Sequence, residues 1–233
     1  MLLWNLGLLI DDPAAFFSLV VVVTLSLLIA ITVHEFSHAL MSDRLGDPTA
    51  RRLGRLSLNP IKHLDPMGTL MLFLVGFGWG KPVPVNPHNF RIESRRGMAL
   101  TGFAGPLSNL IVAALLGILV RLDVIAWHSP WSSLEPFYSW QASSVVADIV
   151  GYVILLNLIL AVFNLIPIPP LDGFNVAIGI LPRRQAYAWA RMERYGPLIL
   201  LMLIFLGYFT GFLWNFLIRA VDLFARLFVG QAL

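Results

Sequence analysis

The sequence has no cysteine and few charged residues. Of its 233 residues, Asp, Glu, Lys and Arg together make up 12%, whereas 58% are hydrophobic; soluble domains typically carry about 25% charged residues. The absence of cysteine excludes disulfides, thiolate metal ligands and cysteine nucleophiles, so any metal ion must be bound by His, Asp or Glu. A net charge of only +3 does not provide the basic surface that nucleic-acid binding requires. This composition is typical of a protein embedded in a lipid bilayer.

Four apolar stretches are long enough to cross about 30 Å of hydrocarbon as helices. They cover about residues 16–41, 98–120, 145–166, with an irregular extension to 181, and 198–218. A fifth stretch, residues 67–79, has 13 residues and is too short for a comfortable crossing. The sequence therefore predicts an all-α polytopic membrane protein with about four spanning helices; the alternative is five or six spans.

Basic residues flank the short apolar stretch on both sides. Five Lys and Arg lie within residues 43–66 and four within 80–97, and such residues accumulate in cytoplasmic loops. If residues 67–79 spanned the bilayer, one basic cluster would lie outside. A segment that dips in and returns keeps both clusters inside. We therefore expect a re-entrant segment here, with short extended β elements at 53–59 and 81–86 beside it.

The remaining charges predict the orientation. No Lys or Arg occurs between residues 122 and 182, which places the 122–144 loop outside, and four arginines within 183–194 return the chain to the cytoplasm. This gives a multi-pass protein of the cell membrane with its N-terminus outside. Arg219 and Arg226 fit this orientation least well, so residues 221–228 are also a candidate interfacial helix.

The first span contains three ionisable residues, His34, Glu35 and His38. Such groups are costly inside a span and usually face a functional cavity. Because His34 and His38 are four residues apart, both imidazoles project from one helix face and can take two corners of a tetrahedral zinc site. Glu35 is suited to accept a proton from water there. The alternative is structural: the histidines bond to neighbouring helices, and Glu35 pairs with a basic residue such as Arg44.

Asp172 is the best candidate for a third ligand. Three prolines within residues 167–170 precede it and prevent a regular helix. Irregular backbone at membrane depth is tolerated only where it is buried in protein or lines a wet cavity. The alternative is that Asp172 caps a helix over 173–181, and capping and ligation can coexist. A His₂Asp zinc site with one open position for water is suited to hydrolyse amide bonds.

Five separated motifs stand out in the sequence: HEFSH at 34–38, NPIKHLDPMG at 59–68, GWGKPVPVNP at 78–87, GPLSN at 105–109 and NLIPIPPLDG at 164–173. They resemble those of the site-2 proteases, which are intramembrane zinc metalloproteases, and among them the short bacterial and archaeal members without PDZ or CBS domains. The match covers residues 32–182. It implies one membrane protease domain over 1–233, with a catalytic core at about 16–182 and a C-terminal helix at about 196–229.

The resemblance implies that His34, His38 and Asp172 bind one Zn²⁺ per chain and that Glu35 is the general base and acid. Because these residues fall towards the predicted cytoplasmic ends of their spans, we expect the active site to face the cytoplasmic side. The implied reaction is hydrolysis of peptide bonds within or beside the transmembrane segments of membrane proteins. Single-span membrane proteins are the expected substrates, and the lipid bilayer is the expected environment. No nucleic-acid partner is expected, and both a monomer and a homo-oligomer are compatible with the sequence.

The resemblance also implies roles for two asparagines and two glycines. Asn109 and Asn164 would face the active site, where an amide N–H₂ can steady an oxyanion or hold the substrate. Their alternatives are hydrogen bonding between helices for Asn109 and satisfaction of carbonyls at the proline break for Asn164. Gly76 and Gly78 belong to a membrane-dipping hairpin over 76–85 that offers a strand edge to an unwound substrate.

Two other classes of function remain open at this stage. A zinc or divalent-metal transporter would use His34, His38, Asp172 and Asp148 to line an ion path, but it gives Glu35 no role. A non-catalytic binder of membrane helices would need none of the metal-binding pattern. Zinc flux into proteoliposomes separates the transporter from a protease that holds its ion tightly.

Overall fold

The computed structural model of the chain describes residues 6–75, 78–130 and 142–232. These residues are helical in most of their length, and no β-strand occurs among them. In chain order the helices are α1 (Leu6–Asp11), α2 (Pro13–Arg44), α3 (Thr49–Arg52), η2 (Pro60–Lys62), α4 (Pro66–Val75), η3 (Pro87–Asn89), α5 (Ser94–Arg121), α6 (Ala142–Asn164), α7 (Asp172–Ile180), α8 (Arg183–Ala190), η5 (Glu193–Tyr195), α9 (Gly196–Thr210) and α10 (Phe212–Phe228). The expected all-α class is confirmed.

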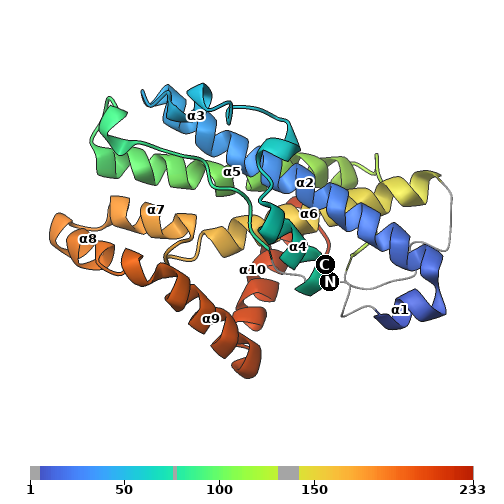
Figure 1. Cartoon of the computed structure of the whole chain (residues 1–233). Helices are drawn as coiled ribbons and strands as arrows, with labels where there is room; N and C mark the ends of the chain where they lie inside the picture. Colours follow the sequence, from blue (N-terminus) through green and yellow to red (C-terminus); the bar gives the residue numbers. More distant parts are fainter. Residues whose placement is uncertain (1–5, 76–77, 131–141, 233) are drawn as a thin grey trace.

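Three long helices, α2, α5 and α6, lie side by side and form the centre of the molecule (Figure 1). Small residues are buried along them, including Ala30 and Ala39 of α2 and Ala113 of α5, and such residues let helix backbones approach closely in a membrane protein. A larger apolar cluster fills the space between α5, α6 and α10. Its buried members are Ala113, Val120, Ile154, Leu155, Leu158, Val162, Val221, Ala225 and Val229.

Four helical segments are long and apolar enough to cross a membrane: Pro13–Arg44, Ser94–Arg121, Ser144–Asn164 and Arg183–Thr210. The first three correspond to the predicted spans at 16–41, 98–120 and 145–166. The number of candidate spans among the described residues thus agrees with the expected four.

The predicted fourth span at 198–218 is wrong in its extent. Gly211 adopts a left-handed conformation (φ 66°) that ends α9 and begins α10, and glycine reaches this region without a Cβ penalty. The helix expected at 196–229 is therefore two helices. In Figure 1, α9 runs obliquely away from the three central helices and α10 returns to pack on α5 and α6.

The short apolar stretch forms α4, and its two ends lie together. Leu64 and Gly80 form an isolated antiparallel bridge, and the Lys81 N–H donates to the His63 carbonyl at 2.8 Å. We call these paired residues, 63–64 and 80–81, the neck. The chain therefore leaves and returns at one point, although the extended pieces expected at 53–59 and 81–86 form no strand among the described residues.

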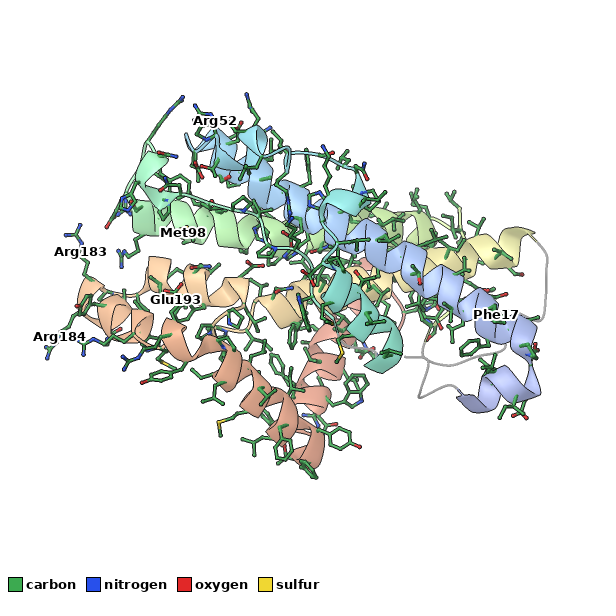
Figure 2. The ribbon with its side chains drawn as sticks, in the orientation of Figure 1. Phe17, Arg52, Met98, Arg183, Arg184 and Glu193 are labelled. Atoms are coloured by element: carbon green, nitrogen blue, oxygen red, sulfur yellow. The ribbon has the colours of Figure 1, made fainter. Side chains whose placement is uncertain are left out.

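Arginines gather at one end of the molecule. Figure 2 shows Arg52, Arg183 and Arg184 at that end and Phe17 at the other. The loops there are tied together by Asp47, which is fully buried and accepts hydrogen bonds from Thr49, the Asn86 N–H and Asn89. Burial alone would raise the pKa of Asp47, but these hydrogen bonds bring the pKa below its usual value.

Candidate metal centre

Helix α2 presents His34 and His38 to the interior of the bundle. The helix continues without interruption from Pro13, where the Asp12 side chain accepts a hydrogen bond from the Ala15 N–H at 3.0 Å and caps its first turn. Both histidines are buried, and their rings lie 4.6 Å apart in an edge-to-face arrangement. One turn of helix therefore fixes two imidazoles in the core.

Asp172 reaches the same place from the loop that joins α6 to α7. This loop folds tightly against the start of α7: a Cβ on Gly173 would lie only 2.2 Å from the Leu165 carbonyl oxygen. Asp172 is the first residue of α7, Leu171 takes the cap position, and no side-chain cap hydrogen bond forms. Asp172 therefore does not cap α7 with its side chain, which was the alternative role considered for it. Its carboxylate is directed to the histidines instead.

Three side-chain atoms converge between α2 and α7. The Oδ2 of Asp172 lies 3.0 Å from the Nε2 of His34 and 3.2 Å from the Nε2 of His38, and the two Nε2 atoms are 3.0 Å apart. Among the described residues, this is the one group of three or more His, Asp or Glu side chains arranged to hold a metal ion.

The protons of the two imidazoles lie on their far sides. The Nδ1 of His34 is 2.7 Å from the Oδ1 of Asn109, and the Nδ1 of His38 is 2.6 Å from the Thr101 carbonyl oxygen. These oxygens can only accept, so each Nδ1 carries a proton, and in the neutral imidazoles each Nε2 then presents a lone pair. Two nitrogen lone pairs and a carboxylate oxygen then face one another, which is an arrangement that a bound cation stabilises. The donor set fits Zn²⁺.

Asn109 is held in place by a buried network. Its Nδ2 donates to the Ala30 carbonyl at 3.0 Å and to the Oδ1 of Asn157 at 2.7 Å. Asn157 in turn donates to the Val153 carbonyl at 2.8 Å, which fixes its orientation. Both amide hydrogens of Asn109 are thus directed to neighbouring helices, which is the alternative weighed for this residue, while its oxygen orients His34.

Gly105 of α5 provides the room for the two imidazoles. A Cβ at this position would lie 2.4 Å from the Nε2 of His38 and 2.7 Å from the Cε1 of His34, well inside van der Waals contact. The glycine at the start of the GPLSN motif is therefore needed for the close approach of α5 to the ligands.

Glu35 faces the neck of the α4 excursion. A Cβ on Gly80 would lie 3.7 Å from the Oε1 of Glu35 and 3.5 Å from the Cγ2 of Ile31. The return segment after α4 therefore packs on α2 at Ile31 and Glu35, next in sequence to the candidate ligand His34. Gly78 belongs to this segment, whereas Gly76 lies outside the described residues.

Asn164 and Asp148 make hydrogen bonds to groups other than the three candidate ligands. The Nδ2 of Asn164, at the end of α6, donates to the Leu160 carbonyl of its own helix at 2.9 Å. The buried carboxylate of Asp148 pairs with the Nδ1 of His128 at 2.7 Å, and Asp148 is not a member of the ligand group. The ion path required by the transporter hypothesis therefore lacks its fourth residue at the cluster.

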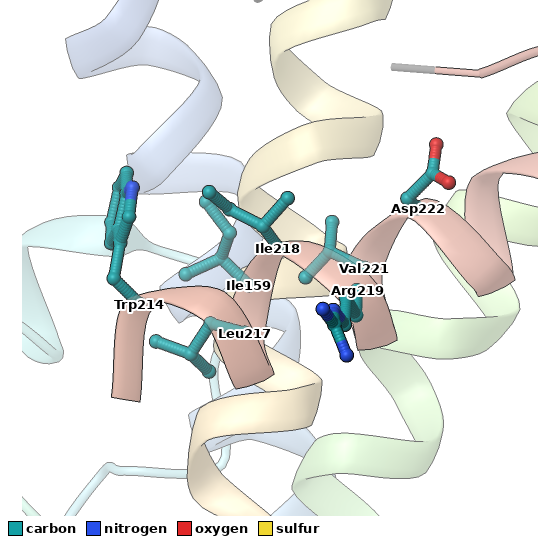
Figure 3. A pocket seen from close by; sticks show the side chains of 7 residues that line it. All are labelled: Ile159, Trp214, Leu217, Ile218, Arg219, Val221 and Asp222. Atoms are coloured by element: carbon teal, nitrogen blue, oxygen red, sulfur yellow. The ribbon is translucent and has the colours of Figure 1, made fainter. Parts of the chain in front are cut away.

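An apolar recess of about 130 Å³ lies between α6 and α10 (Figure 3). Its lining residues are Ile159, Trp214, Leu217, Ile218, Arg219, Val221 and Asp222. None of them belongs to the ligand group, so the recess is separate from the candidate metal centre.

Sequence reasoning missed three residues around the ligands. Asn157 carried a usable signal, because an amide in the middle of an apolar span is rare. Gly105 lies within the GPLSN motif, but the sequence pattern alone indicates no role for it. Thr101 carried none, because it contributes a backbone carbonyl that any residue can supply.

Comparison with known proteins identifies several relatives. The model of peptidase family M50 matches residues 133–207. YwhC of Bacillus subtilis, whose name describes it as a zinc metalloprotease, is 36% identical over 218 residues, 91% of this chain and 92% of the relative. Two proteins named Rip2, also described by name as zinc metalloproteases, match as well. The protein from Mycolicibacterium smegmatis is 29% identical over 82% of this chain and 70% of its own length. The protein from Mycobacterium tuberculosis is 30% identical over 86% and 74%. No solved structure matches the chain.

Proposed function

The chain belongs to peptidase family M50, the site-2 protease family, and is a zinc metalloprotease of the membrane; from this premise we propose that it cleaves peptide bonds within or beside the transmembrane segments of single-span membrane proteins. The observation that carries the proposal is the convergence of His34, His38 and Asp172 next to Glu35 inside a bundle of apolar helices. This activity would place the protein in regulated intramembrane proteolysis.

His34, His38 and Asp172 would together hold one zinc ion per chain. Zinc bound there would supply a Lewis acid that lowers the pKa of water and polarises a peptide carbonyl. The protein's own contribution begins with orientation. Asn109 and the Thr101 carbonyl hold the imidazole protons on the Nδ1 atoms, which keeps both Nε2 atoms available as ligands.

Glu35 is the proposed general base and acid. Its carboxylate accepts a proton from the attacking water as the water oxygen bonds to the scissile carbonyl carbon. The same group then donates this proton to the amide nitrogen, the C–N bond breaks, and an acid and an amine leave. Its place next to His34 in α2, facing Gly80, supports this role.

The segment after α4 is the proposed substrate-binding element. An unwinding transmembrane helix must exchange its internal hydrogen bonds for others, because lipid offers none. Gly80 lies on α2 at Glu35, and an extended peptide could pair with the backbone of the segment that contains Gly78 and Gly80. We propose that α4 is re-entrant, which the pairing of its two ends at the neck supports.

The proposed orientation places the arginine-rich end in the cytoplasm and the N-terminus outside. This end carries Arg52, Arg183 and Arg184 (Figure 2), in agreement with the tendency of basic residues to stay inside. The metal ligands lie nearer to this end than to the start of α2. Water would therefore reach the site from the cytoplasmic side.

Purified protein reconstituted in liposomes with candidate single-span substrates tests the proposal. We expect the wild type to bind one equivalent of zinc and to cleave. Glu35→Gln should bind the same amount of zinc and cleave nothing, because only the proton-transfer group has changed. Glu193→Gln, which alters an exposed acid in η5, is the matched control and should cleave like the wild type. Retained cleavage by Glu35→Gln with zinc bound would contradict the mechanism.

A further inference from the structure

Arg55 is a buried arginine that binds the return segment after α4. It is only 6% exposed and lies between α3 and η2. One guanidinium nitrogen, Nη2, donates to the Lys81 carbonyl and to the Pro82 carbonyl, the latter at 3.4 Å. A single guanidinium nitrogen thus holds two successive backbone carbonyls at once.

The burial of this guanidinium is not explained by an ion pair. Among the described residues, no carboxylate lies within ion-pair distance of Arg55, and its buried Nε has no hydrogen-bond partner there. A buried, unpaired charge is costly, and an apolar residue would fill the space at lower cost. The described interactions of the buried Arg55 guanidinium are its hydrogen bonds to the Lys81 and Pro82 carbonyls. We therefore attribute its presence here to these bonds.

That backbone continues directly from the residue that faces Glu35. Gly80 packs against the Glu35 carboxylate, and the next residue, Lys81, is fixed from two sides. Its N–H donates to the His63 carbonyl at 2.8 Å and its carbonyl accepts from Arg55. His63 is itself fully buried, with its Nε2 2.7 Å from the Ser57 carbonyl. The start of the segment is thus rigidly positioned relative to α2.

The residues that follow can donate to an incoming peptide at two points. Pro82 and Pro84 have no N–H, and the N–H of Lys81 is taken. This leaves the N–H groups of Val83 and Val85, neither of which donates to another described residue. In extended backbone, groups two residues apart lie on the same edge, so the two valines can meet one substrate strand in a single register.

We propose that Arg55 is a positioning residue that fixes the register in which Val83 and Val85 present the substrate backbone to Glu35. The inference rests on the proposed function and adds which residue determines the peptide bond that is cleaved. By binding the carbonyls of Lys81 and Pro82, Arg55 fixes where the N–H groups of Val83 and Val85 lie in space relative to Glu35. A substrate paired with those donors then has one peptide bond at the metal centre.

Steady-state cleavage of one single-span substrate tests this inference, with products identified by mass spectrometry and zinc measured on each variant. Arg55→Ala should bind one equivalent of zinc, raise KM by about tenfold or more, since each backbone hydrogen bond is worth up to about a factor of ten, and spread cleavage over neighbouring bonds. Arg55→Lys, whose ammonium also carries several donors on one nitrogen, should recover part of this loss. Arg52→Ala, at an exposed arginine three residues away, is the control and should match the wild type.

Unchanged KM and an unchanged single cleavage site in Arg55→Ala would overturn the inference, and so would a fall in kcat alone. If Arg55→Ala does not fold, Val83→Pro decides, because it removes one donor and leaves Arg55 in place. A raised KM with zinc retained supports the register role, and an unchanged KM contradicts it. Failure of the proposed function is distinct, because the wild type itself would then not cleave in a Glu35-dependent manner.

Discussion

Replacement of Asn109 by alanine separates two explanations of this residue. Asn109 is fully buried, and its amide makes three hydrogen bonds, at 2.7 Å to the His34 Nδ1, 2.7 Å to the Asn157 Oδ1 and 3.0 Å to the Ala30 carbonyl. If the amide orients His34, its loss weakens a metal ligand. If the amide stabilises the oxyanion, its loss slows catalysis with the metal still in place.

The structure favours the first explanation, because both amide hydrogens are already engaged. Loss of a hydrogen-bond partner of a metal-binding histidine costs about 10–100-fold in metal affinity, which corresponds to about 1.4–2.7 kcal/mol. We therefore expect Asn109→Ala to bind zinc about 10–100-fold more weakly and to regain most of its cleavage rate at saturating zinc. The loss of the buried network should also lower the free energy of unfolding by about 1–3 kcal/mol.

Competition with a chromophoric zinc chelator in detergent measures the affinity, and cleavage at saturating zinc measures catalysis. Asn164→Ala is the matched control, since that amide donates to a carbonyl of its own helix, and we expect its zinc affinity to equal that of the wild type. The reasoning is refuted if Asn109→Ala keeps wild-type zinc affinity but loses cleavage at saturating zinc. It is also refuted if both variants lose zinc to the same extent.

Three further predictions follow from the same geometry. Gly105→Ala places a Cβ 2.4 Å from the His38 Nε2 and should displace the imidazole by about 1 Å, a shift that can cost about 100-fold in activity; Gly7→Ala, where nothing lies within 4 Å of the added atom, should have no effect on cleavage or zinc content. Asp47→Asn should lower the unfolding temperature at pH 7. Because the folded-state pKa of Asp47 lies below its usual value, its stabilisation is present above an unfolded-state pKa of about 3.9 and is lost as the pH falls through the lower folded-state value. The difference in unfolding temperature from the wild type should therefore shrink below about pH 4, and a constant difference from pH 7 to pH 3 would contradict this assignment. Removal of zinc with a chelator should lower the unfolding temperature of the wild type, because a ligand that binds only the folded state stabilises it, and should leave that of Asp172→Asn nearly unchanged.

Much of the helical framework could be predicted from the sequence, because a helix that crosses lipid needs a long apolar stretch whatever its neighbours are. Helices α2, α5 and α6 follow this rule. The break at Gly211 does not, because hydropathy averages over a window and is insensitive to one left-handed residue. The polar spacing of Asn215, Arg219, Asp222 and Arg226 was the available signal that residues after 211 form a different helix.

The candidate ligands could be predicted because their pattern is local. His34 and His38 share a helix face through their spacing, and Asp172 is marked by the prolines before it. The partners that orient these ligands depend instead on which helices are neighbours. Asn157 lies 48 residues from Asn109 in the chain and Thr101 lies 63 from His38, and no local pattern specifies such a contact.

The neck between residues 63–64 and 80–81 also has a consequence for how this protein can change over evolution or by engineering. Because the chain enters and leaves the excursion at one hydrogen-bonded point, the contact of Gly80 with Glu35 does not depend on the length of what lies between. Each doubling of a closed loop costs only about 0.6 kcal/mol in chain entropy. If α4 is re-entrant as proposed, its length can therefore change with the thickness of the bilayer while the contact at its base stays the same.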